Sequence, residues 1–134
     1  AYAHLFSYFR GEEWRTQKET QRLLDKYFTT KPNGIPGNDD TGTMSAWAIF
    51  NMIGFYPDCP GLPEYTLTTP VLNKVTIRLD PKWYKEKELV IESNRTQPGT
   101  LYINKVLLNG KKFNQYRITH DELVHSQRIL FNLK

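Results

Sequence analysis

The chain has 134 residues, of which 39% are hydrophobic, 13% aromatic and 24% charged, and this composition is typical of a folded domain and excludes intrinsic disorder. The net charge of +4 raises the question of an anionic partner, but Lys and Arg alternate with Asp and Glu along the chain, so we expect no nucleic-acid binding. No segment is long and apolar enough to span a membrane, and a single cysteine excludes an internal disulfide.

The first 56 residues have the pattern of helices. Residues 1–9 are rich in apolar side chains and predict the end of a buried helix, and residues 12–28 predict an amphipathic helix with acidic residues in its first turn. Residues 43–54 predict a short helix that is apolar on nearly every side. Such a helix is buried between other helices, and this sequence supplies at most two neighbours for it.

The loop of residues 30–42 is rich in Gly, Pro and Asn, and it contains the strongest candidate for chemistry. Asn38, Asp39 and Asp40 lie just before the predicted helix, where free backbone N–H groups and the helix dipole favour an ionised carboxylate. An ionised carboxylate suits a general base. The alternative is that a polar residue of this segment only caps the helix. A calcium loop of the EF-hand type is excluded, because Ile49 occupies the position of its bidentate Glu.

From residue 57 onward, prolines and then short β-branched runs replace the helical pattern, and Asn109-Gly110 predicts a two-residue hairpin. The sequence therefore indicates an α+β chain, with a helical part in residues 1–56 and a small antiparallel β-sandwich in residues 57–134. The predicted strands are 65–69, 74–79, 88–93, 101–108, 112–116 and 128–132.

Aromatic and histidine side chains give weaker signals. The three histidines have no metal-ligand spacing, so we interpret them as structural or surface residues. Trp47 lies in the apolar helix and is expected in the core. Trp14 and Trp83 lie at a helix start and in an exposed loop, where either indole could stack on a sugar ring.

Residues 34–42, Gly-Ile-Pro-Gly-Asn-Asp-Asp-Thr-Gly, followed by Met-Ser-Ala-Trp at 44–47, closely resemble a motif of glycoside hydrolase family 92. Further segments resemble other elements of that family, so the match covers nearly the whole chain. These segments are Trp-Arg-Thr-Gln at 14–17, Ile-Gly-Phe-Tyr-Pro at 53–57, Cys-Pro-Gly at 59–61, 107–111 and 118–123.

The resemblance implies an exo-acting, inverting α-mannosidase, often specific for α-1,2 linkages, that needs Ca²⁺ and is periplasmic or secreted. The helices of residues 12–28 and 43–54 would be late helices of an (α/α)₆ barrel, followed by a C-terminal β region. The partners would be a mannose-containing glycan and the remainder of the same catalytic domain. An acidic Glu and an Asn-Glu-Pro motif would precede residue 1, so the isolated 134 residues are expected to be inactive.

The resemblance also implies roles for individual residues. Asp40 would be the general base, with Asp39 as its rival or as a partner in holding the water. Asn38 would contact the sugar, or form part of the calcium shell together with Asp40, and Trp14 would contact the substrate.

Two other hypotheses stay open at this point. In the first, the β region is a non-catalytic module that binds carbohydrate or supports a larger enzyme. In the second, the chain belongs to another (α/α)₆ glycosidase that acts on glucose-type linkages.

Overall fold

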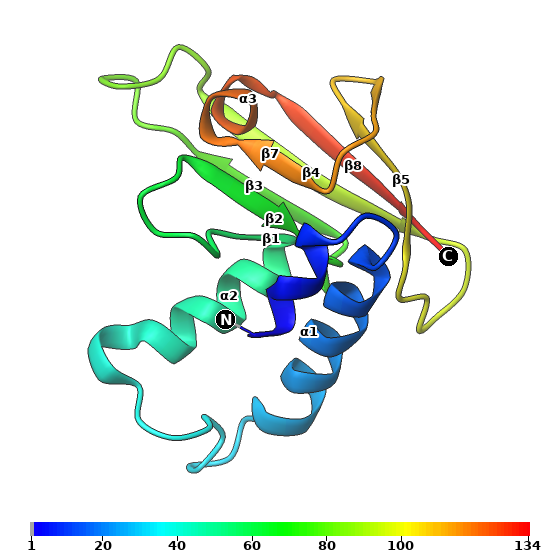
Figure 1. Cartoon of the computed structure of the whole chain (residues 1–134). Helices are drawn as coiled ribbons and strands as arrows, with labels where there is room; N and C mark the ends of the chain where they lie inside the picture. The colour runs from blue at the N-terminus through cyan, green and yellow to red at the C-terminus, as the bar shows by residue number, and fades with distance from the viewer. Residues whose placement is uncertain (1) are drawn as a thin grey trace.

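Two α-helices form the N-terminal part of the chain (Figure 1), of which the computed structural model describes residues 2–134. The first, α1 (Glu13–Tyr27), confirms the helix predicted for residues 12–28, and its buried residues, Thr16, Gln17, Thr20 and Leu24, lie on one face. The second, α2 (Thr43–Ile53), confirms the helix predicted for residues 43–54. It ends at Gly54, whose φ of 116° gives the left-handed conformation that closes a helix.

The start of the chain differs from the prediction of a buried helix end. Tyr2–Tyr8 form a 3₁₀-helix, η1, in which Ala3 and His4 are buried, while Tyr2, Leu5 and Tyr8 are exposed. Residue 1 lies outside the described part of the chain. The helix α2 is also only partly covered, since Trp47 and Ala48 are buried but Ile49 is 57% exposed. The helical part therefore presents apolar side chains that the described residues do not cover.

The rest of the chain forms two β-sheets and one short helix. The three-stranded sheet has the order β1-β2-β7 and is antiparallel; its strands are Phe55–Tyr56, Glu64–Leu67 and Arg117–Thr119. The five-stranded sheet has the order β3-β4-β8-β5-β6. Its strands are β3 (Lys74–Arg78), β4 (Glu88–Arg95), β8 (Arg128–Leu133), β5 (Ile103–Leu108) and β6 (Lys111–Phe113).

The α+β class is confirmed, and so is the predicted hairpin. Asn109 and Gly110 connect β5 to β6, and their φ values are 48° and 80°. A two-residue hairpin turn of type I′ requires a positive φ at both residues. One pair departs from the antiparallel expectation, because β4 and β8 run parallel and make the five-stranded sheet mixed. A parallel pair needs a long connection, and residues 96–127 provide it.

Three short elements were not predicted from the sequence, and the first of them lies at the end of the part predicted as helical. These are β1, β7 and the helix α3 (His120–His125). Two-residue and three-residue strands have too little pattern to recognise, but α3 had a local signal. Thr119 and Glu122 form a reciprocal capping box at its start, the Thr-x-x-Glu spacing that marks a helix N-terminus.

One core joins both sheets and the end of α2. Phe55, Leu67 and Ile118 from the three-stranded sheet share a buried cluster with Ile91 and Phe131 from the five-stranded sheet. The side chains of Phe50 and Ile53 pack against the same cluster from α2, so the helical and β parts are in direct contact.

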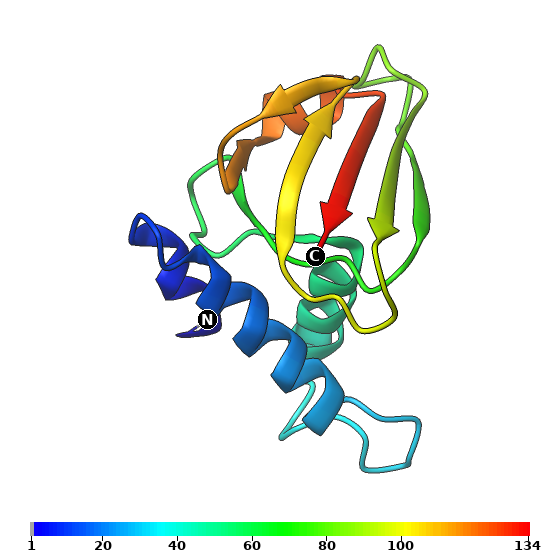
Figure 2. The ribbon, with the colours of Figure 1, turned by 90° about the vertical axis from the view of Figure 1, so that its right-hand side faces the viewer.

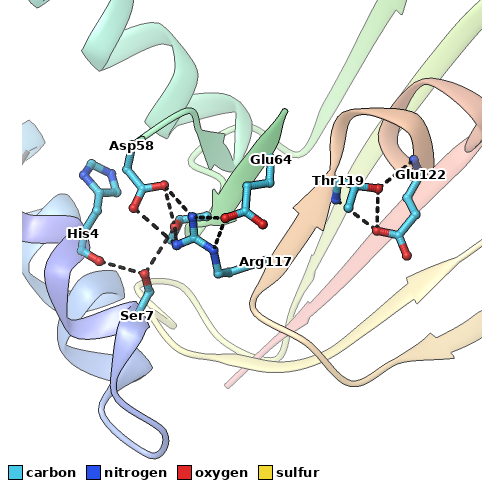
Figure 3. A network of polar contacts seen from close by, with 8 residues as sticks. His4, Ser7, Asp58, Glu64, Arg117, Thr119 and Glu122 are labelled. Carbon is cyan, nitrogen blue, oxygen red and sulfur yellow. Dashed lines mark hydrogen bonds and ion pairs between the residues drawn. The ribbon is translucent and has the colours of Figure 1, made fainter. Parts of the chain in front are cut away.

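Polar contacts hold the β part together and also reach the helical part. Arg117 on β7 binds both Asp58, whose side chain is 3% exposed, and Glu64, with nitrogen–oxygen distances of 3.2 and 2.9 Å (Figure 3). Its guanidinium also lies 4.3 Å from the ring centroid of Tyr8 in η1. On α1, Gln17 accepts a hydrogen bond of 2.9 Å from the backbone of Ile103. The predicted division at residue 56 therefore has extensive contacts across it and stays a prediction.

Candidate functional site

The loop between α1 and α2 holds the predicted site residues in one segment. Residues 29–34 form a hydrogen-bonded turn. The backbone N–H of Thr29 donates to the carbonyl of Gly34, and the N–H of Gly34 donates to the carbonyl of Lys31, each at 2.9 Å. A side chain at Gly34 would have no room, since its Cβ would lie 2.0 Å from the carbonyl oxygen of Thr29. This glycine is therefore required by close backbone approach, and the turn sets the course of the segment that follows.

Asp39 is held by the start of α2. Its carboxylate accepts hydrogen bonds from the backbone N–H of Met44 at 2.8 Å and of Ser45 at 2.9 Å, and from the Ser45 hydroxyl at 2.5 Å. The hydrogen bonds from the Ser45 hydroxyl and from the Ser45 and Met44 N–H groups lower the pKa of Asp39 below its usual value. Asp39 thus caps α2 from a position three residues before Gly42, the residue that precedes the helix.

Asp40 has a different environment, although it is the next residue. It begins a single 3₁₀ turn, η2 (Asp40–Gly42), and its backbone carbonyl accepts hydrogen bonds of 2.7 Å from the hydroxyls of Thr41 and Thr43. Its side chain is exposed, and within residues 2–134 its carboxylate accepts no hydrogen bond and forms no ion pair. Asp40 therefore has both carboxylate oxygens available for a water molecule or a ligand.

The backbone of this turn is strained. Thr41 has a φ of 55° and a ψ of 22°, in the left-handed region that β-branched residues rarely adopt. The hydroxyl of Thr41 bonds to the carbonyl of Asp40, the residue immediately before it. Strain of this kind persists only where the surrounding contacts fix it, and such positions cluster at functional sites.

The structure brings Asn38, Asp39 and Asp40 together and places Trp14 elsewhere. Asn38 is exposed, next to the capping Asp39. Trp14 lies in the first turn of α1, whereas the loop with Asn38 follows the other end of that helix (Figure 1). Its indole packs edge to face on Tyr102, with centroids 6.4 Å apart, and is 41% exposed. A substrate contact by Trp14 therefore stays a prediction and would be separate from the aspartates.

A metal ion would find few ligands in this chain alone. Among residues 2–134 there is no group of three or more His, Cys, Asp or Glu side chains that could hold a metal. Asn38 and Asp40 are exposed oxygen donors of the kind that Ca²⁺ prefers, but this ion takes about six to eight oxygens. The two residues fit part of a calcium shell, and the remaining ligands would have to come from outside these 134 residues.

An apolar cavity of about 950 Å³ lies beside the segment, between η1, α1 and α2. Side chains of all three elements line it, among them Phe6, Leu23 and Trp47, and it reaches Pro36 and Met44 on either side of the aspartates. The sequence indicates that this region lacks neighbours, and the structure locates the uncovered surface next to Asp39 and Asp40.

The role of Ser45 was missed from the sequence. Ser45 lies in α2, and its side chain and its backbone N–H both bond to Asp39. Ser45 follows Asp39 by six positions, which is no known capping spacing, so the pairing depends on the 3₁₀ turn that folds the aspartate back over the helix start. No helix in the described part of the chain has the length and hydropathy needed to cross a membrane.

Comparison with known proteins identifies the chain's relatives. The family model described as the glycosyl hydrolase family 92 catalytic domain matches residues 1–134. A family GH92 α-mannosidase from Bacteroides thetaiotaomicron, solved in complex with mannoimidazole, is 31% identical with a TM-score of 0.88, covering 98% of this chain and 17% of that one. A family GH92 inverting mannosidase from the same organism is 35% identical with a TM-score of 0.78, covering 91% of this chain and 16% of that one.

A curated relative agrees with these structures. An uncharacterized secreted glycosidase from Arthroderma benhamiae is 27% identical over 114 residues, which is 85% of this chain and 14% of that protein. The chain thus spans less than a fifth of the length of each of these three relatives. Since the family model covers the whole chain, this protein belongs to glycosyl hydrolase family 92.

Proposed function

We propose that residues 1–134 act as part of an exo-acting, inverting α-mannosidase in which Asp40 is the general base. The observation that carries the proposal is the contrast between two adjacent carboxylates, since Asp39 is bonded to the start of α2 and Asp40 is exposed and unbonded. The relatives named as an α-mannosidase and as an inverting mannosidase support the reaction type, at 31% and 35% identity.

Inversion requires a carboxylate on one face of the sugar and a carboxylic acid on the other, about 6.5–9.5 Å apart. In the proposed reaction the Asp40 carboxylate takes a proton from a water molecule while the water oxygen attacks the anomeric carbon. The bond to the leaving oxygen breaks, and that oxygen receives a proton from an acid supplied by the rest of the enzyme. Asp39 cannot serve equally well, because its two oxygens already accept three hydrogen bonds.

We also propose Ca²⁺ as a cofactor, with Asn38 and Asp40 as part of its oxygen shell. When bound, the ion would grip vicinal hydroxyls of mannose and favour distortion of the ring. Asn38 is free to offer its amide to the sugar or to the ion, because its side chain is exposed beside Asp39, the residue that caps α2. The expected preference for α-1,2 linkages belongs to this proposal.

The rest of the catalytic domain is the proposed cover of the apolar cavity. The relatives are about six times longer than this chain, as the 16–17% coverage of the solved structures implies. Further helices of an (α/α)₆ barrel would bury Phe6, Leu23 and the exposed Ile49. The 134 residues alone are therefore proposed to be inactive, and the whole enzyme is proposed to be secreted or periplasmic, as the name of the secreted relative supports.

The test uses the full-length protein that contains this sequence. Wild type, Asp40→Asn and Asp39→Asn would be assayed on 4-nitrophenyl α-mannoside and α-1,2-mannobiose, with and without EDTA. Asp40→Asn is expected to lower kcat by about 10²–10⁴-fold, the usual contribution of a general base. Proton NMR would identify the first anomer released, which is β-mannose for an inverting reaction. Full activity of Asp40→Asn, or release of α-mannose first, would overturn the proposal.

A further inference from the structure

The connection between β3 and β4 presents a tryptophan far from the aspartates. Trp83 is 71% exposed, and the connection extends from the end of the five-stranded sheet next to α3 (Figure 1). The views in Figures 1 and 2 both place this connection and the loop with Asp40 at opposite ends of the molecule. Any role of Trp83 is therefore separate from the proposed base.

Hydrogen bonds hold the turn that carries Trp83. The carbonyl of Asp80 accepts from the backbone N–H of Trp83 and of Tyr84, each at 3.0 Å, and its carboxylate accepts from the N–H of Lys82 at 2.8 Å. The Lys82 ammonium lies 4.8 Å from the centroid of the indole. These contacts order the turn, so the exposed ring loses little conformational freedom when it binds a ligand.

The turn is anchored to α3. The hydroxyl of Tyr84 lies 3.3 Å from Nε2 of His120, and Nδ1 of the same ring lies 2.9 Å from the hydroxyl of Tyr65 on β2. His120 is the first residue of α3, whose start is fixed by the capping box of Thr119 and Glu122 (Figure 3). The tryptophan is thus presented by a turn that is tied to the body of the protein.

A polar hollow follows the tryptophan in the chain, where the connection enters β4 and where residue 127 precedes β8. It has a volume of about 370 Å³ and begins two residues after Trp83; its lining is Lys85, Glu86, Lys87, Glu88 and Gln127. The lining has two ammonium groups, two carboxylates and one amide, so it offers both donors and acceptors with balanced charge. One carboxylate oxygen of Glu86 is buried and has no hydrogen-bond partner within residues 2–134. The carboxylates and the amide of the lining can accept hydrogen bonds from ligand hydroxyls.

We propose that Trp83 and this polar hollow form a second carbohydrate-binding site, which takes a neutral hexose unit of a glycan chain. A pyranose has an apolar face that stacks on an indole and a rim of hydroxyls that pair with mixed donors and acceptors. An anionic ligand would need an excess of cations, and the lining has none. A protein partner is disfavoured as well, because Lys and Glu are depleted from the centres of protein interfaces.

Such a site goes beyond the proposed hydrolysis. It would hold a long glycan on the enzyme while the aspartates at the other end process a chain end, and so raise the local substrate concentration. A small soluble mannoside cannot occupy both sites at once. The site would therefore matter for polymeric substrates and leave the hydrolysis of small ones unchanged.

The test compares variants of the full-length protein by affinity electrophoresis in gels that contain yeast mannan. Trp83→Ala is expected to bind mannan about tenfold more weakly than wild type, the effect of losing roughly 1.4 kcal/mol of stacking. Glu86→Gln is expected to weaken binding too, and Trp83→Tyr to retain most of it. Leu62→Ala serves as the matched control, because Leu62 is 52% exposed and lies in another loop.

The outcomes separate this proposal from the hydrolytic one. Equal retardation of wild type and Trp83→Ala in mannan would overturn the second site, even if 4-nitrophenyl α-mannoside is hydrolysed normally. Absence of hydrolysis with a mannan affinity that depends on Trp83 would overturn the proposed reaction and leave the site standing. If another part of the full-length chain covers Trp83, wild type will not be retarded and Trp83→Ala will lower the Tm, which also overturns the site.

Discussion

Ser45 donates two hydrogen bonds to the carboxylate of Asp39, from its backbone N–H at 2.9 Å and from its hydroxyl at 2.5 Å. This pairing makes Asp39 the cap of α2 and leaves Asp40, one residue later, exposed. The two adjacent aspartates therefore have different tasks. Asp39 fixes the start of the helix, and the fixed turn presents the carboxylate of Asp40.

Removal of the cap is the first test of this division. Asp39→Ala leaves the N–H groups of Met44 and Ser45 without their acceptor, so we expect the Tm to fall by about 1 °C, the effect of one lost helix cap in a chain of the full-length size. Ser45→Ala removes one of the three hydrogen bonds and should have a smaller effect. Differential scanning calorimetry of the full-length variants measures both. Asp40→Ala is the matched control, and a Tm loss equal to that of Asp39→Ala would contradict the assignment.

The same cap predicts a pH dependence. Hydrogen bonds lower the folded-state pKa of Asp39, whereas the unfolded chain has the ordinary value of about 3.9. A carboxylate whose pKa is lower in the folded state stabilises the fold at pH values above its unfolded-state pKa. This stabilisation is lost as the pH falls through the folded-state pKa. The difference in Tm between wild type and Asp39→Ala should be constant above about pH 5 and shrink below about pH 4. A difference that stays unchanged at pH 3 would show that the charge contributes nothing.

Gly34 tests whether the turn before the aspartates positions them. Gly34→Ala places a Cβ within 2.0 Å of the Thr29 carbonyl oxygen, so the backbone of the loop must move. We expect a drop of at least about tenfold in kcat, because small displacements of a catalytic group are costly. Gly37→Ala is the control, since nothing lies within 4 Å of its Cβ although its φ of 73° makes the change unfavourable. Equal loss of kcat in both variants would argue for general loop strain.

Arg117 tests a buried polar cluster of the β part that also reaches Tyr8 in η1. Arg117→Ala leaves the carboxylate of Asp58, whose side chain is 3% exposed, without its cation, and it also removes the contact with Tyr8. We expect a loss of stability of about 2–4 kcal/mol, because an unpaired buried charge is costly even with some access of solvent. Thermal unfolding measures the loss.

A second substitution identifies the source of that loss. Asp58→Asn in the Arg117→Ala background removes the unpaired charge, so part of the stability should return. Strictly additive losses from the two substitutions would show that the pair is not coupled. Arg128→Ala is a suitable comparison, because the Arg128 side chain is 57% exposed and exposed ion pairs contribute little to stability.

The sequence by itself determined the elements whose signal is local. The helix of residues 13–27, the helix that ends at Gly54 and the Asn109-Gly110 hairpin follow from periodicity, a glycine stop and a dipeptide that accepts positive φ. The motif of residues 34–42 carried the family resemblance, which the family model confirms. The helix α3 could also have been found from the Thr119–Glu122 spacing.

The tertiary structure decided what depends on residues that are distant in the sequence. The parallel pairing of β4 with β8 joins segments more than 30 positions apart, and the short strands β1 and β7 exist because β2 lies between them. Because Asp39 and Asp40 are adjacent in the sequence, their positions alone could not show which of them caps the helix. The fold separates them physically, because the 3₁₀ turn brings one carboxylate over free N–H groups and leaves the next one in solvent.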